Sequence, residues 1–204
     1  MSYLFLSCTE LFHIVVIKRG RNLERLFSIE TDRLILNELK EDDLKFIFEL
    51  FSNSIVLEFY DLKAFTSLEE AEALIEKMHK KWDQQLGFRH AIRHKHDGII
   101  FGTCGVNSIK QINDDFGVVI GYELHPDAWG VGYMQEALIG LIQYLKQEQL
   151  FRKKIKYIWA EIFEKNVRSQ QVANRLGFEL IGTTVNHTVN TLGGDLLKFE
   201  LKLY

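Results

Sequence analysis

Between residues 116 and 148, a strand pattern runs through a two-glycine turn directly into a helix pattern. Phe116–Leu124 is an apolar run that predicts a strand, and Gly132–Glu148 repeats apolar side chains at helical spacing. The turn between them reads Trp129-Gly130-Val131-Gly132-Tyr133-Met134. Two glycines let the backbone bend tightly and approach a ligand closely, and the free N–H groups at a helix N-terminus attract anions. We therefore expect this turn to bind a phosphate or diphosphate group.

Two common nucleotide-binding motifs do not fit this turn. A dinucleotide-binding fingerprint needs a third glycine at a fixed spacing, and a P-loop needs a Gly-Lys-Ser/Thr ending. Neither is present after Trp129. The residues therefore exclude both motifs, although a two-glycine turn alone is a weak signal of function.

The rest of the chain predicts an α/β (α+β) single domain, with a mixed, mostly antiparallel central sheet flanked by helices. Short turns join the strands between residues 88 and 124, so we expect antiparallel neighbours there, followed by a parallel βαβ crossover. Further strands are expected at Thr31–Leu39, Phe88–Arg93, Gly98–Asn107, Lys156–Ile162, Phe178–Val185 and Asp195–Leu203, and further helices at Glu41–Phe51, Ser67–Trp82 and Val167–Leu176.

Charge and cysteine content exclude several classes of protein. A net charge of −3 gives no basic face for nucleic acid, so we expect no nucleic-acid partner. Cys8 and Cys104 have neither disulfide-framework nor zinc-site spacing, which favours a reducing cytoplasm and no metal. His94 and His96 lie in a turn-rich stretch and are interpreted as solvated loop residues.

The first 27 residues form an apolar segment of uncertain role. Glu10 and His13 interrupt its apolar run, and its basic residues follow the run, so we expect neither a secretory signal nor a membrane span. We assign residues 1–27 to an N-terminal extension and residues 28–204 to the domain. The extension is interpreted as an added strand or helix, a dimer contact, or sequence upstream of the natural start.

Three blocks in order resemble a known family from about Glu30 to Tyr204. They are ETDRLILNEL, GYELHPDAWGVGYMQEAL and NVRSQQVANRLGFELIG. Together they resemble the GNAT acetyltransferases, and more narrowly the RimJ/RimL-like branch that acetylates ribosomal-protein N-termini. The resemblance implies a GNAT-like fold, acetyl-CoA as co-substrate without a metal, and transfer of the acetyl group to a primary amine.

The resemblance also implies which residues bind the cofactor. Its pantetheine arm pairs with the strand Val118–Leu124, and its diphosphate rests on amides of the turn. The cofactor-binding residues are then Tyr122, Leu124, Trp129, Gly130, Val131, Gly132, Tyr133, Met134, Asn166 and Ser169. Two of these residues have an alternative interpretation: Trp129 as an aromatic that packs beside the turn, and Asn166 as a plain helix N-cap. Met134 departs from the family pattern, because many members have Gly or Ala at this position.

Two residues are candidates for catalysis by the same resemblance. Ser169 matches a serine that protonates the leaving thiolate, with an ordinary helix serine as the alternative. Many other members use a tyrosine four residues further on, and that position is Ala173 here. Glu123 is the candidate general base, with a structural carboxylate as the alternative, and Tyr122 is expected to face the other way on its strand. Where the branch has another glutamate near the substrate, this chain has Thr188.

Three hypotheses for function stay open at this point. The leading one is acetylation of the N-terminal α-amine of a ribosomal or other protein. The second is acetylation of a small amine (a polyamine, an amino acid or an aminoglycoside), and the third is a non-catalytic CoA-binding protein. Phe59–Tyr60 is expected where such folds form a wall of the acceptor site. We expect no membrane partner, and a homodimer is compatible with the branch.

Overall fold

A computed structural model describes residues 15–18, 27–185 and 194–204 of the chain. The described strands are β1 Val15–Lys18, β2 Phe27–Glu30, β3 Leu34–Glu38, β4 Phe88–His94, β5 Ile100–Ile112, β6 Asp115–Leu124, β7 Ile155–Phe163, β8 Glu179–Thr184 and β9 Leu196–Lys202. The helices are α1 Leu44–Ser52, α2 Ser54–Leu57, α3 Leu68–Asp83, α4 Tyr133–Gln147 and α5 Val167–Arg175, with 3-10 turns at Glu41–Asp43 and Pro126–Ala128.

All described strands join one sheet in the order β1-β2-β3-β4-β5-β6-β7-β9-β8. Every neighbouring pair is antiparallel except β6 and β7, which are parallel and are connected through α4. The predicted mixed, mostly antiparallel sheet with one βαβ crossover is confirmed.

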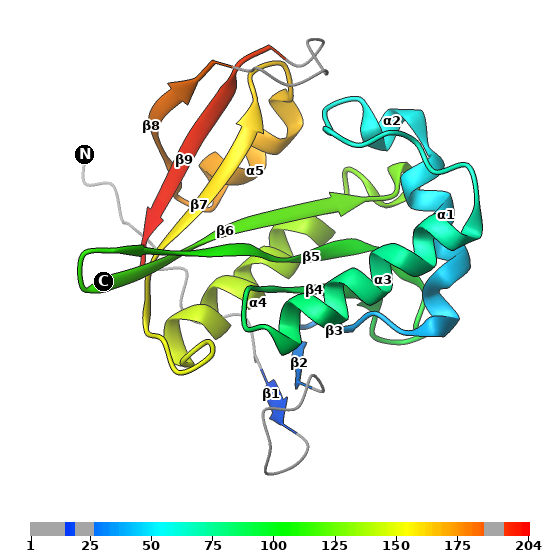
Figure 1. Ribbon diagram of the computed structural model, residues 1–204, viewed down its shortest axis with the longest axis horizontal. Coiled ribbons are helices and arrows are strands. Elements are labelled where there is room, and N and C mark those ends of the chain that lie inside the picture. The colour runs from blue at the N-terminus through cyan, green and yellow to red at the C-terminus, as the bar shows by residue number, and fades with distance from the viewer. Residues whose placement is uncertain (1–14, 19–26, 186–193) are drawn as a thin grey trace, which may run out of the picture.

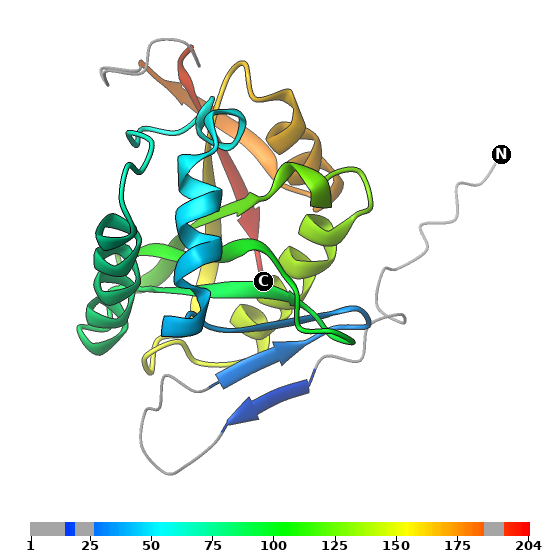
Figure 2. The same ribbon diagram turned by 90° about the vertical axis from the view of Figure 1, so that its right-hand side faces the viewer.

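Helices cover both faces of this sheet. Figures 1 and 2 show α1 and α3 on one face and α4 and α5 on the other. Each face has its own apolar cluster: Ile47, Leu50 and Ile75 pack under α1 and α3, whereas Leu138 and Leu141 pack under α4. The amphipathic stripes of the sequence therefore account for the layers.

Local details differ from the sequence predictions in four places, one of which is β5, expected at Gly98–Asn107 and observed to continue to Ile112. The helix expected at Glu41–Phe51 begins as a 3-10 turn, and α1 starts only at Leu44. The strand expected from Thr31 starts at Leu34, because the Thr31 N–H donates to the Leu34 carbonyl at 2.9 Å in a tight turn. Helix α2 was expected to be loop, since four residues are too few to show a helical period.

The N-terminal segment contributes to the main sheet. Strand β1 pairs with β2, and β2 pairs with β3, both antiparallel. Phe27, which begins β2, is buried and stacks on Tyr144 of α4 at a centroid distance of 4.6 Å. The predicted extension therefore supplies β1 and the start of β2, and its other residues lie outside the described ranges.

A buried histidine lies in this part of the core. The side chain of His90 on β4 is 3% exposed, and its ring centroid is 4.4 Å from Phe27 and 4.9 Å from Phe88. Its Nδ1 atom has no hydrogen-bond partner in the described part of the chain. Burial lowers the pKa of His90 to about 3, so the folded protein holds this ring neutral at physiological pH.

We predict that His90 makes the fold sensitive to mild acid. An unfolded histidine takes up a proton below about pH 6.5, whereas the folded one does so only near pH 3. Its contribution to stability is therefore complete above pH 6.5 and falls as the pH drops toward 3. Between pH 7 and pH 5 the loss is about 2 kcal/mol, and His90→Leu should remove that part of the pH dependence. Urea unfolding at both pH values measures it, and equal losses in the two proteins would contradict the assignment.

Candidate active site

The parallel pairing of β6 and β7 stops before either strand ends. The last paired positions are Ile120 and Ala160, yet β6 continues to Leu124 and β7 to Phe163. Figure 1 shows β7 leaving β6 to run beside β9, while β6 continues along β5. Beyond the split, the backbone groups on the facing edges of β6 and β7 no longer pair with each other. An extended ligand with amide groups can pair with such edges.

A cavity of about 710 Å³ lies at this split. That volume is in the range of small-molecule and cofactor sites. The structure brings together around it all the sequence-predicted site residues except Val131: Tyr122, Glu123, Leu124, Trp129, Gly130, Gly132, Tyr133, Met134, Asn166 and Ser169. The remaining lining comes chiefly from α2 with the segment after it, from β7 and from α5.

The two-glycine turn forms one end of the cavity. Gly130 and Gly132 have φ angles of +80° and +84°, a region that side chains other than glycine rarely adopt. Gly132 is the N-cap of α4, so the first N–H groups of this 15-residue helix begin at the turn. Met134 is 7% exposed and packs into the core, so the larger side chain at this position does not block the turn.

Trp129 connects the turn to α5. Its indole N–H donates to the carbonyl of Leu124 at 3.0 Å, which fixes the ring at the end of β6. The guanidinium of Arg168 on α5 lies 4.1 Å from the ring centroid, and it also forms an ion pair of 3.7 Å with Glu58 after α2. Trp129 therefore packs at the turn and holds a cation at the edge of the cavity.

Asn166 and Ser169 enter the cavity from the start of α5. The Asn166 side chain caps this helix, because its Oδ1 accepts a hydrogen bond of 3.1 Å from the Ser169 N–H. The Ser169 Oγ lies 2.7 Å from the phenol oxygen of Tyr122 on β6. Burial raises the pKa of Tyr122 to about 12, and its hydrogen bond with Ser169 only partly opposes this shift. The phenol is therefore protonated at neutral pH.

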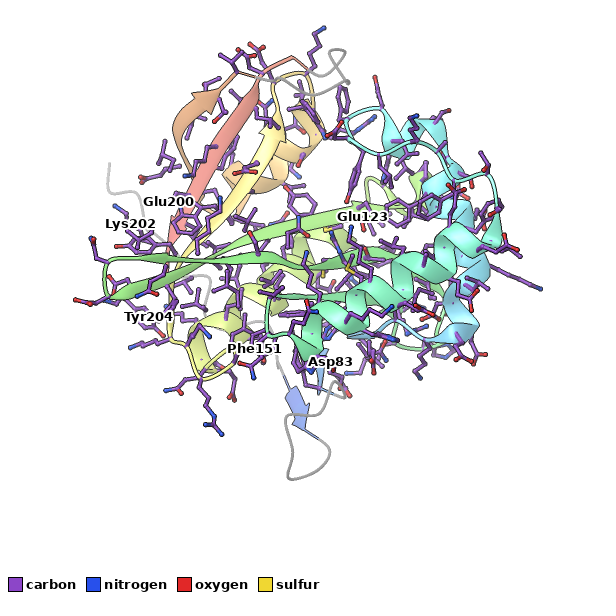
Figure 3. The ribbon with its side chains drawn as sticks, viewed as in Figure 1. Asp83, Glu123, Phe151, Glu200, Lys202 and Tyr204 are labelled. Atoms are coloured by element: carbon purple, nitrogen blue, oxygen red, sulfur yellow. The ribbon has the colours of Figure 1, made fainter. Side chains whose placement is uncertain are left out.

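Glu123 points to the opposite side of β6 from Tyr122, as strand alternation predicts. Its side chain is 4% exposed and accepts hydrogen bonds from Tyr60 at 3.1 Å, from Arg89 at 3.3 Å and from the hydroxyl of Thr103. Figure 3 labels this residue near the end of β6. The carboxylate is thus held by three donors from three different segments.

Charge compensation explains why this cluster is stable inside the protein. Burial works most strongly against the charged form of Arg89, but Glu123, Tyr60 and Cys104 together outweigh it, and the pKa of Arg89 is raised. Burial and the Glu123 charge also raise the pKa of Tyr60 above its ordinary value. Both groups keep their protons and can donate to the carboxylate.

Sequence reasoning did not single out Arg89 and Thr103. A charged residue directly after Phe88 in the predicted strand Phe88–Arg93 is a weak signal for Arg89, whereas a threonine in a strand gives none. Tyr60 was expected in a wall of the acceptor site, and it does line the cavity. Thr188 lies outside the described residues.

The described ranges contain neither a metal-binding cluster nor a helix suited to cross a membrane. No group of three or more His, Cys, Asp or Glu side chains there could hold a metal ion. His94 pairs instead with Asp97 at 3.0 Å. Likewise, no helix among these residues is long and apolar enough to span a bilayer.

Comparisons with known proteins agree with this architecture. The family model "Acetyltransferase (GNAT) domain" matches residues 33–179. The uncharacterized N-acetyltransferase YoaA of Bacillus subtilis (strain 168) is 29% identical over 154 residues, covering 76% of this chain and 84% of YoaA.

Solved structures of two acetyltransferases have a similar fold. RimL, a ribosomal L7/L12 α-N-protein acetyltransferase, matches with a TM-score of 0.71 and 21% identity, over 92% of this chain and 99% of its own. Spermidine N-acetyltransferase from Vibrio cholerae, solved with CoA and spermine, matches with a TM-score of 0.70 and 17% identity, over 84% and 96%. At these identities the likeness shows the fold alone.

We predict strong coupling between Arg89 and Glu123. Replacing Arg89 by Met leaves a buried carboxylate without its cation, which should lower the free energy of unfolding by about 3 kcal/mol. Adding Glu123→Gln to that variant should recover part of the loss, because the uncompensated charge is then gone. Urea unfolding of both single variants and the double variant measures the coupling, and simply additive losses would contradict it.

Proposed function

The chain belongs to the acetyltransferase (GNAT) domain family, and we propose that it acetylates the α-amine of a protein N-terminus, with ribosomal proteins as the leading class. The chain is an acetyl-CoA-dependent acetyltransferase of the GNAT type, with an N-acetyltransferase as its relative. The acceptor is the part that we infer from the cavity.

The apolar wall opposite α5 carries the proposal. Helix α2 and the segment after it line the cavity with Ile55, Val56, Phe59 and Tyr60. Ile55 is 53% exposed, so an apolar side chain stands at the edge of the site. A peptide has uncharged backbone and side chains beyond its amine, and such a wall can pack against them.

The charges that line the cavity also favour an acceptor with one amine. Of the lining carboxylates Asp61, Glu123 and Glu161, the second is paired with Arg89, and the third lies 3.6 Å from Lys110. A polyamine carries several ammonium groups and gains most where several carboxylates are uncompensated. A single α-amine needs only one such carboxylate. We propose Asp61, which lines the cavity, for this role.

The proposed reaction uses residues on both sides of β6. A neutral amine attacks the thioester carbonyl, the C–S bond breaks, and the thiolate needs a proton. We assign the donation of that proton to the Ser169 hydroxyl. The Tyr122 phenol, 2.7 Å from the Ser169 Oγ, can then return a proton to Ser169. Glu123 is our candidate for taking up the amine proton, through a water molecule, because its side chain is held at the cavity by Tyr60.

Location and assembly remain proposals of the same kind. The free, buried thiol of Cys104 is compatible with the reducing cytoplasm in which we place the reaction. A homodimer is retained as a prediction from the sequence.

We predict that peptide N-termini are the preferred acceptors. Release of CoA thiol should be measured with peptides beginning with Ser or Ala, and with spermidine, amino acids and aminoglycosides. We expect turnover with peptides, with kcat/KM rising with pH through the α-amine pKa of about 8 and levelling off above it, where most of the amine is neutral. Turnover with small amines alone would replace the proposed acceptor. Binding of acetyl-CoA without any turnover would favour the non-catalytic alternative.

A second prediction concerns the proton donor. Ser169→Ala should lower kcat about 100-fold, a typical effect of losing a general acid, and Tyr122→Phe should lower it about tenfold. Acetyl-CoA affinity should fall by less than kcat in both variants. Ser52→Ala is the matched control, because this hydroxyl donates to the Phe65 carbonyl at 3.0 Å and does not line the cavity. Full activity of Ser169→Ala would remove Ser169 from the mechanism.

A further inference from the structure

Residues 31–33, about a hundred positions before the glycine turn, lie against the first turn of α4. Glu136 in that turn is 4% exposed, and its carboxylate accepts three hydrogen bonds from this segment. The donors are the hydroxyl of Thr31 at 2.6 Å, the backbone N–H of Arg33 at 2.8 Å and the Arg33 Nε at 2.6 Å. A buried carboxylate with these donors fixes the position of the helix start.

The same arginine also binds the residue between the two glycines. Its Nη1 donates to the carbonyl of Val131 at 3.1 Å, and its guanidinium lies 4.7 Å from the centroid of the Tyr133 ring. Its Nη2 is 3.6 Å from the place that a Cβ atom would take on Gly132. Arg33 therefore contacts the residues on both sides of Gly132, which are Val131 and Tyr133.

This contact determines the direction of a peptide group. In a trans peptide the N–H points opposite to the preceding carbonyl. Since the Val131 carbonyl faces Arg33, the N–H of Gly132 faces away from it. Val131 itself does not line the cavity, whereas Gly132 does.

Without such a contact, a turn with two glycines has much conformational freedom. Glycine loses more backbone entropy on ordering than any other residue, so a mobile turn weakens the binding of any ligand that must order it. We propose that Arg33 is a positioning residue, which holds the amides of the Gly130–Gly132 turn ready for the diphosphate of acetyl-CoA. This inference rests on the proposed function, because it takes the cofactor diphosphate to lie on this turn.

The test compares CoA with pantetheine, which lacks the diphosphate and the adenosine 3′-phosphate of CoA. CoA binding is measured by calorimetry, and pantetheine binding by NMR titration. Arg33→Ala should weaken CoA about tenfold and pantetheine less than twofold, because only CoA uses the turn. Arg33→Lys should recover part of the loss, since a lysine can donate to Glu136 but lacks the fork that also reaches Val131.

Arg93→Ala is the matched control. Arg93 donates two hydrogen bonds, of 2.6 and 2.9 Å, to the carboxylate of Asp43, which is 3% exposed. This contact is comparable to Arg33–Glu136, but it lies at the 3-10 turn before α1 rather than at the glycine turn. Its loss should lower the melting temperature and leave CoA affinity within twofold. Circular dichroism confirms folding, and Arg33→Lys serves for the binding test if Arg33→Ala does not fold.

The outcomes separate this inference from the proposed function. Unchanged CoA affinity in the Arg33 variants, or equal weakening of CoA and pantetheine, overturns the positioning role while the enzyme assignment stands. Failure of the wild-type protein to bind CoA overturns the cofactor site itself. Selective weakening of CoA that is absent in Arg93→Ala supports the inference.

Discussion

The end of pairing between β6 and β7 is the constraint on which the site depends. Each strand keeps its outer neighbour, β5 or β9, so the sheet stays intact while the two inner edges separate. Buried backbone N–H and C=O groups need partners, and a ligand can supply them here. The crossover through α4 places a helix N-terminus beside the same opening. One break in the pairing thus puts a strand-like binding edge and an anion-binding turn together.

Two buried carboxylates next to this opening are each compensated by an arginine from a distant segment. Glu123 meets Arg89, and Glu136 meets Arg33. Uncompensated, either carboxylate would be costly to bury and would repel an anionic ligand. With its arginine and further hydroxyl donors, each carboxylate instead joins distant segments of the chain. The rigidity of the site therefore comes from neutral clusters of charged groups as well as from apolar packing.

The sequence predicted most of the sheet and its layers, because strands and helices with one buried face leave a clear period. It did not predict α2, which is shorter than a helical period can reveal. The cavity-lining residues Asn166 and Ser169 came from motif resemblance. Arg33–Glu136 and Arg89–Glu123 were not predicted, since their partners are 103 and 34 positions apart and only the folded chain brings them together. Long-range pairs of this kind leave no local pattern.

Two separate parts of the chain form most of the lining of the cavity. The edges, the turn and the helix cap come from residues 116–175, whereas the apolar wall comes from residues 55–61 and joins them through the contacts Tyr60–Glu123 and Glu58–Arg168. Substitutions of Ile55, Val56 or Phe59, which take no part in these two contacts, can change the shape of the wall without breaking them. The outer part of the wall is therefore separable from the rest of the cavity, because its shape depends on side chains outside the two contacts.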